Sequence, residues 1–198
     1  AELISAIRNN DHQKVIDILI SNFEQSGKKY SQSAYVIGRE FIRLNQYEVG
    51  RKWFRKAKIR NKKFNLYGSQ IELDIRKCNE YLFAKGDSRF KEGDYYSARE
   101  LYTLASTRIG EKEKMYFSAY LRFACVYCKI GDYVDADQST LQALQHHHRT
   151  DLALILNKLI VKMLNKKKQT PNREAEIDNV KKEIDRCIAV IMTELHDS

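Results

Sequence analysis

The chain has 198 residues, of which 43% are hydrophobic and 31% charged, and its formal net charge at pH 7 is +9. It holds 1 proline and 8 glycines, too few for the many turns of a β-sandwich or β-barrel. Composition therefore predicts an all-α protein with a core of its own, and the basic balance favours acidic partners.

Residues 1–26 predict a degenerate pair of helices that breaks near Asn9–Asp11. Three later segments, 31–60, 64–106 and 114–149, align with one another, and each predicts two helices around a short break. The breaks are Asn45-Gln46-Tyr47, Gly93-Asp94-Tyr95 and Gly131-Asp132-Tyr133. A small residue follows each tyrosine by three positions and another comes seven later: Gly50 and Ala57, Ala98 and Ala105, Ala136 and Ala143.

This repetition has a simple physical basis. Gly-Asp supplies the positive φ that a tight turn between antiparallel helices needs, and small residues let the helices approach closely. One such pair cannot bury its apolar face alone, so the pairs are expected to stack.

Two further helices follow the third segment. Residues 151–168 are strongly apolar, and Thr170-Pro171 is a helix start signal before an amphipathic helix over 171–196. The last helix has a narrow apolar seam: Ile177, Val180, Ile184, Ile191 and Leu195. This seam either caps the stack or pairs with a second copy or another subunit, and we expect capping because an exposed apolar end would aggregate.

The aligned segments resemble the tetratricopeptide repeat (TPR) family. The middle segment matches best, at Leu82, Gly86, Gly93, Tyr95, Ala98, Tyr102 and Ala105. Gly50 and Ala98 lie 48 residues apart and Ala98 and Ala136 lie 38 apart, against ~34 in the standard repeat, so the first helix of 64–106 is extended. The resemblance implies one domain over 1–198, a right-handed superhelical α-solenoid of antiparallel helix pairs with a C-terminal capping helix.

The resemblance also implies a concave groove that binds a peptide or helix. The family's best-known clamp grips a chaperone's C-terminal carboxylate, and only two of the residues at or beside its positions carry a suitable charge. The predicted groove residues are Tyr35, Arg39, Phe83, Asp87, Leu121 and Arg122. Because only two of these residues carry a suitable charge, the carboxylate clamp is not expected here. The expected function is a scaffold or adaptor within a larger protein complex.

A basic run between Arg51 and Lys63 suggests an alternative function. Arg51, Arg55, Lys58 and Lys62 share one helix face, while Trp53, Phe54 and Ala57 turn toward the core. The face is either a solvated surface or a binding site for RNA or another anion.

The remaining chemistry-bearing residues point away from catalysis. Cys125 and Cys128 have the spacing of a redox or metal half-site but lie mid-helix, so we expect packed thiols in a reduced cytoplasmic or nuclear protein. His146–His148 are expected at a helix end. Most aromatic residues are expected in the core, and those that face the groove could anchor a peptide: Tyr95, Tyr96, Tyr102, Tyr116, Phe117, Tyr120, Phe123 and Tyr127. No phosphate loop, catalytic triad or long apolar run is present, so no enzyme, cofactor, metal or membrane insertion is expected.

Overall fold

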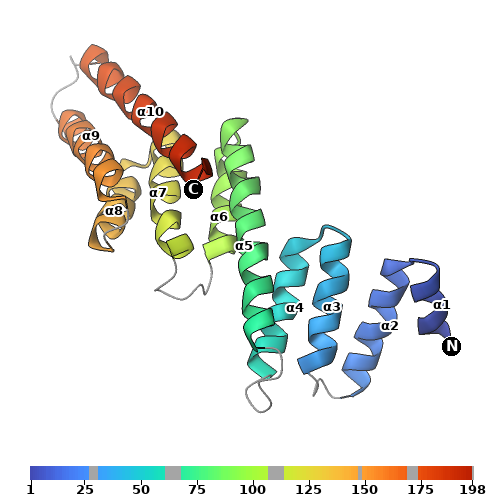
Figure 1. The fold of residues 1–198 in the computed structure, drawn as a ribbon. Helices are drawn as coiled ribbons and strands as arrows, with labels where there is room; N and C mark the ends of the chain where they lie inside the picture. The colour runs from blue at the N-terminus through green and yellow to red at the C-terminus, as the bar shows by residue number, and fades with distance from the viewer. Residues whose placement is uncertain (27–30, 61–67, 107–113, 147–148, 169–173, 198) are drawn as a thin grey trace. The chain divides into compact units, whose positions relative to one another are not determined.

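The structure is a computed structural model that describes residues 1–26, 31–60, 68–106, 114–146, 149–168 and 174–197. These residues form ten helices and no strand (Figure 1), which confirms the all-α prediction. The sequence led us to expect one domain, whereas the internal contacts group the chain into two compact units, Ala1–Leu82 and Phe83–Ser198. Each unit is described by itself. Among the described residues, no helix is both long and apolar enough to span a membrane.

Unit 1 contains four complete helices and the beginning of a fifth. They are α1 (Glu2–Arg8), α2 (His12–Gln25), α3 (Ser31–Arg43), α4 (Tyr47–Arg60) and the first part of α5 (Gly68–Lys91). The first two correspond to the predicted pair over 1–26, and the next two to the predicted pair over 31–60. Successive helices pack against each other around a core that includes Ile16, Phe23, Ile37, Trp53, Phe54 and Ile71.

Unit 2 contains the end of α5 and five further helices. They are α6 (Tyr95–Ser106), α7 (Lys114–Ile130), α8 (Tyr133–Gln145), α9 (Thr150–Lys168) and α10 (Glu174–Asp197). Their ends lie close to the predicted ones; the predicted helix starts at 64 and 171 fall outside the described residues. The extended first helix of the middle segment is confirmed as α5, which runs for 24 residues.

Four helix pairs are joined by the same turn. In each turn one residue has a positive φ: Asn10 (52°), Asn45 (57°), Gly93 (86°) and Gly131 (92°). The next residue donates its N–H to the carbonyl five positions earlier: Asp11 to Ala6 (3.0 Å), Gln46 to Phe41, Asp94 to Arg89 and Asp132 to Tyr127 (each 2.9 Å). This is the Schellman ending of a helix, in which a left-handed residue satisfies the last carbonyls. The predicted positive-φ turn is therefore confirmed, with asparagine in place of glycine in the first two pairs.

Small residues lie where the helices come closest. All five predicted alanines are fully buried: Ala57, Ala98, Ala105, Ala136 and Ala143. A Cβ added at Gly86 would lie 2.5 Å from Cε1 of Tyr102, and one added at Gly38 would lie 2.7 Å from the ring of Phe54. Each of these glycines therefore makes room for an aromatic ring of the paired helix.

The last helix folds back within unit 2. α10 packs against α9 and also against α7, where Lys129 Nζ lies 2.8 Å from Asp185 Oδ1. Its buried side chains are Val180, Ile184, Ile188, Ile191 and Leu195, and Ile177 is half-buried. The apolar seam is thus covered by the chain's own helices, which corresponds to capping among the alternatives that the sequence left open.

Candidate binding groove of unit 2

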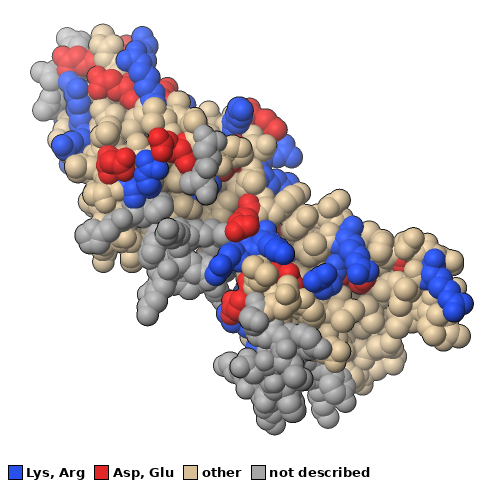
Figure 2. Space-filling view, in the orientation of Figure 1, with Lys and Arg blue, Asp and Glu red and all other residues tan. Residues whose placement is uncertain are grey.

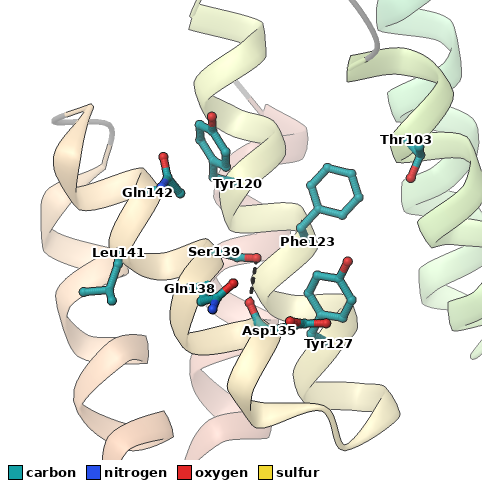
Figure 3. Close-up of a pocket in the computed structure, with 9 residues that line it drawn as sticks. All are labelled: Thr103, Tyr120, Phe123, Tyr127, Asp135, Gln138, Ser139, Leu141 and Gln142. Atoms are coloured by element: carbon teal, nitrogen blue, oxygen red, sulfur yellow. Dashed lines mark hydrogen bonds between the residues drawn. The ribbon is translucent and has the colours of Figure 1, made fainter.

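An open groove of about 460 Å³ lies on unit 2 among α6, α7 and α8 (Figure 3). We call it the aromatic groove, and its lining is Thr103, Tyr120, Phe123, Tyr127, Asp135, Gln138, Ser139, Leu141 and Gln142. α7 supplies the rings, α8 supplies most of the polar groups and α6 supplies Thr103. Figure 3 shows Tyr127 and Asp135 at one end, and Tyr120 and Gln142 at the other.

The rings form a row because their spacing places them on one side of α7. Tyr120, Phe123 and Tyr127 follow one another at intervals of three and four residues, and all three are half-buried. Phe123 makes an edge contact with the buried Tyr102 (centroids 6.2 Å apart, 84°) and a stacked contact with Tyr127 (6.2 Å, 25°). Tyr120 stacks on His146, the residue after α8, at 5.6 Å. Neighbouring rings thus hold the row in position while each ring keeps an accessible side.

The α8 side of the groove carries carboxylate, amide and hydroxyl groups. Ser139 donates its hydroxyl to the backbone carbonyl of Asp135 at 2.8 Å (Figure 3). Asp132 caps α8 by accepting from the N–H of Asp135 at 3.2 Å, and its negative charge raises the pKa of the Asp135 carboxyl above the usual value. None of the ion pairs found among the described residues involves either aspartate. The groove therefore combines aromatic faces with a carboxylate at one end.

A second hollow of about 580 Å³ lies between the end of α5 and α10. Its lining includes Asp87 and Phe90 of α5 and Ile188 and Met192 of α10. Both hollows are walled by helices of unit 2, and the aromatic groove is the more open of the two to solvent.

The predicted concave-groove residues of unit 1 form a hydrogen-bonded cluster. Tyr35 donates its hydroxyl to Asp74 at 2.8 Å. Arg39 donates a hydrogen bond to the same hydroxyl at 3.3 Å and forms an ion pair with Asp74 at 3.7 Å. Burial and the neighbouring Asp74 raise the pKa of Tyr35. Tyr35 is half-buried and Arg39 exposed, so α3 and α5 are linked here by a partly accessible polar contact.

The predicted concave-groove residues of unit 2 are buried, and none of them lines the aromatic groove. Leu121 is 0% exposed, Phe83 3%, Arg122 6% and Asp87 8%. Arg122 donates from Nε and Nη2 to the two carboxylate oxygens of Asp87 (2.9 and 3.0 Å), and Tyr102 donates its hydroxyl to Asp87 Oδ1 at 2.6 Å. The physical reason is that the charges neutralise each other, which lets both be buried between α5 and α7.

The predicted basic surface is reduced by the burial of its first residue, Arg51. Arg51 is 5% exposed and donates to Asn79 at 2.5 Å; burial, aided by the charge of Arg55, lowers its pKa to about 10. Lys58 pairs with Glu72 of α5. Arg51 and Lys58 therefore both contact α5, but Lys58 remains exposed and Arg55 is half-buried. Lys62 lies outside the described residues. On the face drawn in Figure 2, Lys and Arg side chains are scattered among uncharged ones and form no continuous patch.

Cys125 and Cys128 of unit 2 are packed as expected for structural thiols, and Cys187 is half-buried. Cys125 is 0% and Cys128 5% exposed. Burial raises the pKa of Cys128 to about 12 and that of Cys125 well above the usual value, the opposite of what a reactive or metal-binding thiol needs. His146 follows α8 directly, in keeping with a helix-end position; His147 and His148 lie outside the described residues.

The sequence named the three rings of the aromatic groove only within a set of aromatic residues that were mostly expected in the core, and it gave no prediction of the polar side. The signal for that side was present, because residues 135, 138, 139 and 142 recur at helical spacing on α8 opposite the aromatic side of α7. No protein-family model matches the chain, and no curated protein matches it either.

Proposed function

We propose that this chain is a protein–protein interaction module, a scaffold or adaptor within a larger complex, and that its aromatic groove binds a peptide segment or helix of another protein. The observation that carries the proposal is the row of three half-buried rings on α7 beside hydrogen-bonding side chains of α8. Rigid aromatic side chains give much contact area at a small entropic cost, which is why they dominate protein interfaces. Leu141, 49% exposed at the groove, adds apolar surface for a partner.

The proposal includes the finer architecture. We place the chain among TPR-like right-handed α-solenoids with irregular repeats. The shared turn of four helix pairs and the buried small residues at their crossings support this placement. So does the packing of neighbouring helices within the units, from α1 to α4 in unit 1 and from α6 to α10 in unit 2.

The proposed role is binding rather than catalysis, in the cytoplasm or nucleus. Four free cysteines, three of them buried, support a reducing compartment. The RNA-binding alternative rested on the stripe from Arg51, and the contacts of that stripe with α5 no longer favour it.

Selection of peptides by the whole chain tests the proposal. A random peptide library displayed on phage is panned against the immobilised protein, and enriched peptides are synthesised and titrated by isothermal calorimetry. Gln138 and Gln142 are exposed groove residues, so lysines at both positions obstruct the groove without disturbing the core. We expect Gln138→Lys/Gln142→Lys to weaken binding by about tenfold or more.

The matched control carries the same added charge elsewhere. Gln145 and Asn165 are exposed and do not line the groove, so Gln145→Lys/Asn165→Lys should bind within about twofold of the wild type. Circular dichroism checks that both variants remain folded. If no peptide is enriched, or if both variants bind equally well, the proposed function is wrong.

A further inference from the structure

The Tyr127 end of the aromatic groove is lined by the carboxylate of Asp135, and Asp132 precedes it as the N-cap of α8; no ion pair found among the described residues involves either carboxylate. Asp132 and Asp135 are close enough for the first to raise the pKa of the second. Some other carboxylates of unit 2 have basic partners: Asp151 and Glu194 pair with Arg149, and Asp185 pairs with Lys129. In a chain of net charge +9, this end of the groove is therefore locally acidic and favours a cation from outside.

The aromatic rings beside Asp135 indicate which type of cationic side chain the groove can bind. The rings of Phe123 and Tyr127 lie within 25° of parallel, with centroids 6.2 Å apart, and both border the groove. A planar guanidinium can stack on such a ring and, at the same time, donate hydrogen bonds to a carboxylate beside the ring. An ammonium is a more strongly hydrated point charge and cannot stack in this way. The groove therefore favours the side chain of arginine over that of lysine.

The chain contains this arrangement in its own core. The guanidinium of Arg122 lies 4.9 Å from the ring centroid of Phe83 while it donates two hydrogen bonds to Asp87. An aromatic face and an aspartate of one helix, α5, thus already hold one arginine in unit 2. Tyr127 of α7 and Asp135 of α8 offer the same two groups toward solvent.

We propose that the aromatic groove recognises an arginine of its partner, whose guanidinium stacks on Tyr127 and donates to Asp135. An apolar side chain of the same segment then lies on Phe123 and Tyr120, toward the other end of the groove (Figure 3). This inference rests on the proposed function and adds the chemistry of the ligand. It excludes acidic peptide tails, because Asp132 and Asp135 would repel them.

Peptides selected by the wild-type chain provide the test. We expect them to share an arginine, and replacement of that arginine by citrulline, which has the same shape without the charge, to weaken binding by about tenfold. Asp135→Asn should cause a similar loss, and citrulline should cost almost nothing more in that variant. Asp178→Asn, at an exposed position of α10 outside the groove, changes the net charge equally and should leave affinity unchanged.

The possible results distinguish the arginine site from the proposed peptide binding on which it rests. Selected peptides that lack arginine, or equal affinities of Asp135→Asn and Asp178→Asn, would overturn the arginine site while leaving peptide binding intact. A failure to select any peptide overturns both. Asp135 is already repelled by Asp132, so its neutral variant should remain folded, which thermal unfolding by circular dichroism verifies.

Discussion

Arg122 shows how a residue that suggests a ligand site can instead hold two helices together. Its guanidinium binds Asp87 through two hydrogen bonds and Ser118 through a third at 2.8 Å, and it packs over Phe83. A buried carboxylate that loses such a partner keeps its desolvation cost without compensation. The role of this arginine in unit 2 is therefore structural.

Replacing Arg122 tests this structural role. We expect Arg122→Met to lower the free energy of unfolding by about 3–5 kcal/mol, measured by urea denaturation with circular dichroism, because Asp87 stays buried and charged. The double variant Arg122→Met/Asp87→Leu should recover much of that loss. Arg89→Met breaks only an exposed pair with Glu92 and should cost about 1 kcal/mol or less. Equal losses in Arg122→Met and Arg89→Met would contradict the structural role.

Residue-level prediction from sequence worked for turns and failed for buried charge. Gly93 and Gly131 could be identified because the reason for glycine is local: a positive φ after an apolar helix. Arg122 and Asp87 lie 35 residues apart, and neither position reveals that the other will neutralise it. A charged residue without a visible partner is placed by default at the surface, and this default put Arg122 and Arg51 in the wrong environment.

At the scale of helices, the crossing of α5 and α6 depends on the missing side chain of Gly86. Helix propensity alone would favour alanine there by about 1 kcal/mol. The ring of Tyr102 leaves no room for the added methyl group. This ring is 0% exposed, and its hydroxyl donates a hydrogen bond to Asp87. A Cβ at position 86 would lie 2.5 Å from Cε1 of Tyr102, so the ring would have to move. Such a movement would break its hydrogen bond with Asp87.

We therefore expect Gly86→Ala to destabilise unit 2 by about 1–3 kcal/mol in spite of its better helix propensity. Urea denaturation followed by circular dichroism measures the change. Ser88→Ala, at an exposed position of the same helix, is the control and should be neutral or slightly stabilising. A Gly86→Ala chain as stable as the wild type would mean that the helices separate at little cost and that the small residue has no packing role.

Helix boundaries could be predicted better than helix faces. The turns define where α3, α4, α6 and α8 begin or end, so their bounds follow from local sequence. The orientation of α4 does not follow from local sequence, because neighbouring helices cover α4 on more than one side. Trp53 packs against Phe23 of α2, while Arg51 and Lys58 meet α5. A basic stripe on a helix packed between neighbours can thus become an interhelical seam.

At the scale of the whole molecule, the sequence predicted the long helix α5 but not the division of the chain into two units. The spacing of the aligned segments revealed extra length before the middle one, and that length is helical in α5. The division falls between Leu82 and Phe83, within this uninterrupted helix, so no linker marks it. Charge does differ: unit 1 holds 16 of the 35 basic residues but only 9 of the 26 acidic ones.

Whether the two units unfold separately can be measured because the chain has a single tryptophan. Trp53 lies in the core of unit 1, 5.3 Å from Phe23 between ring centroids, so its fluorescence reports on that unit, whereas circular dichroism reports on all helices. Gly38→Ala places a Cβ 2.7 Å from Phe54 in unit 1 and should move the fluorescence midpoint by about 1 M urea. Gly86→Ala should shift only part of the dichroism transition and leave the fluorescence midpoint near its wild-type value, since helical-repeat stability is a sum of local interactions. If Gly86→Ala moves both signals equally, the chain is one cooperative domain, as the sequence first led us to expect.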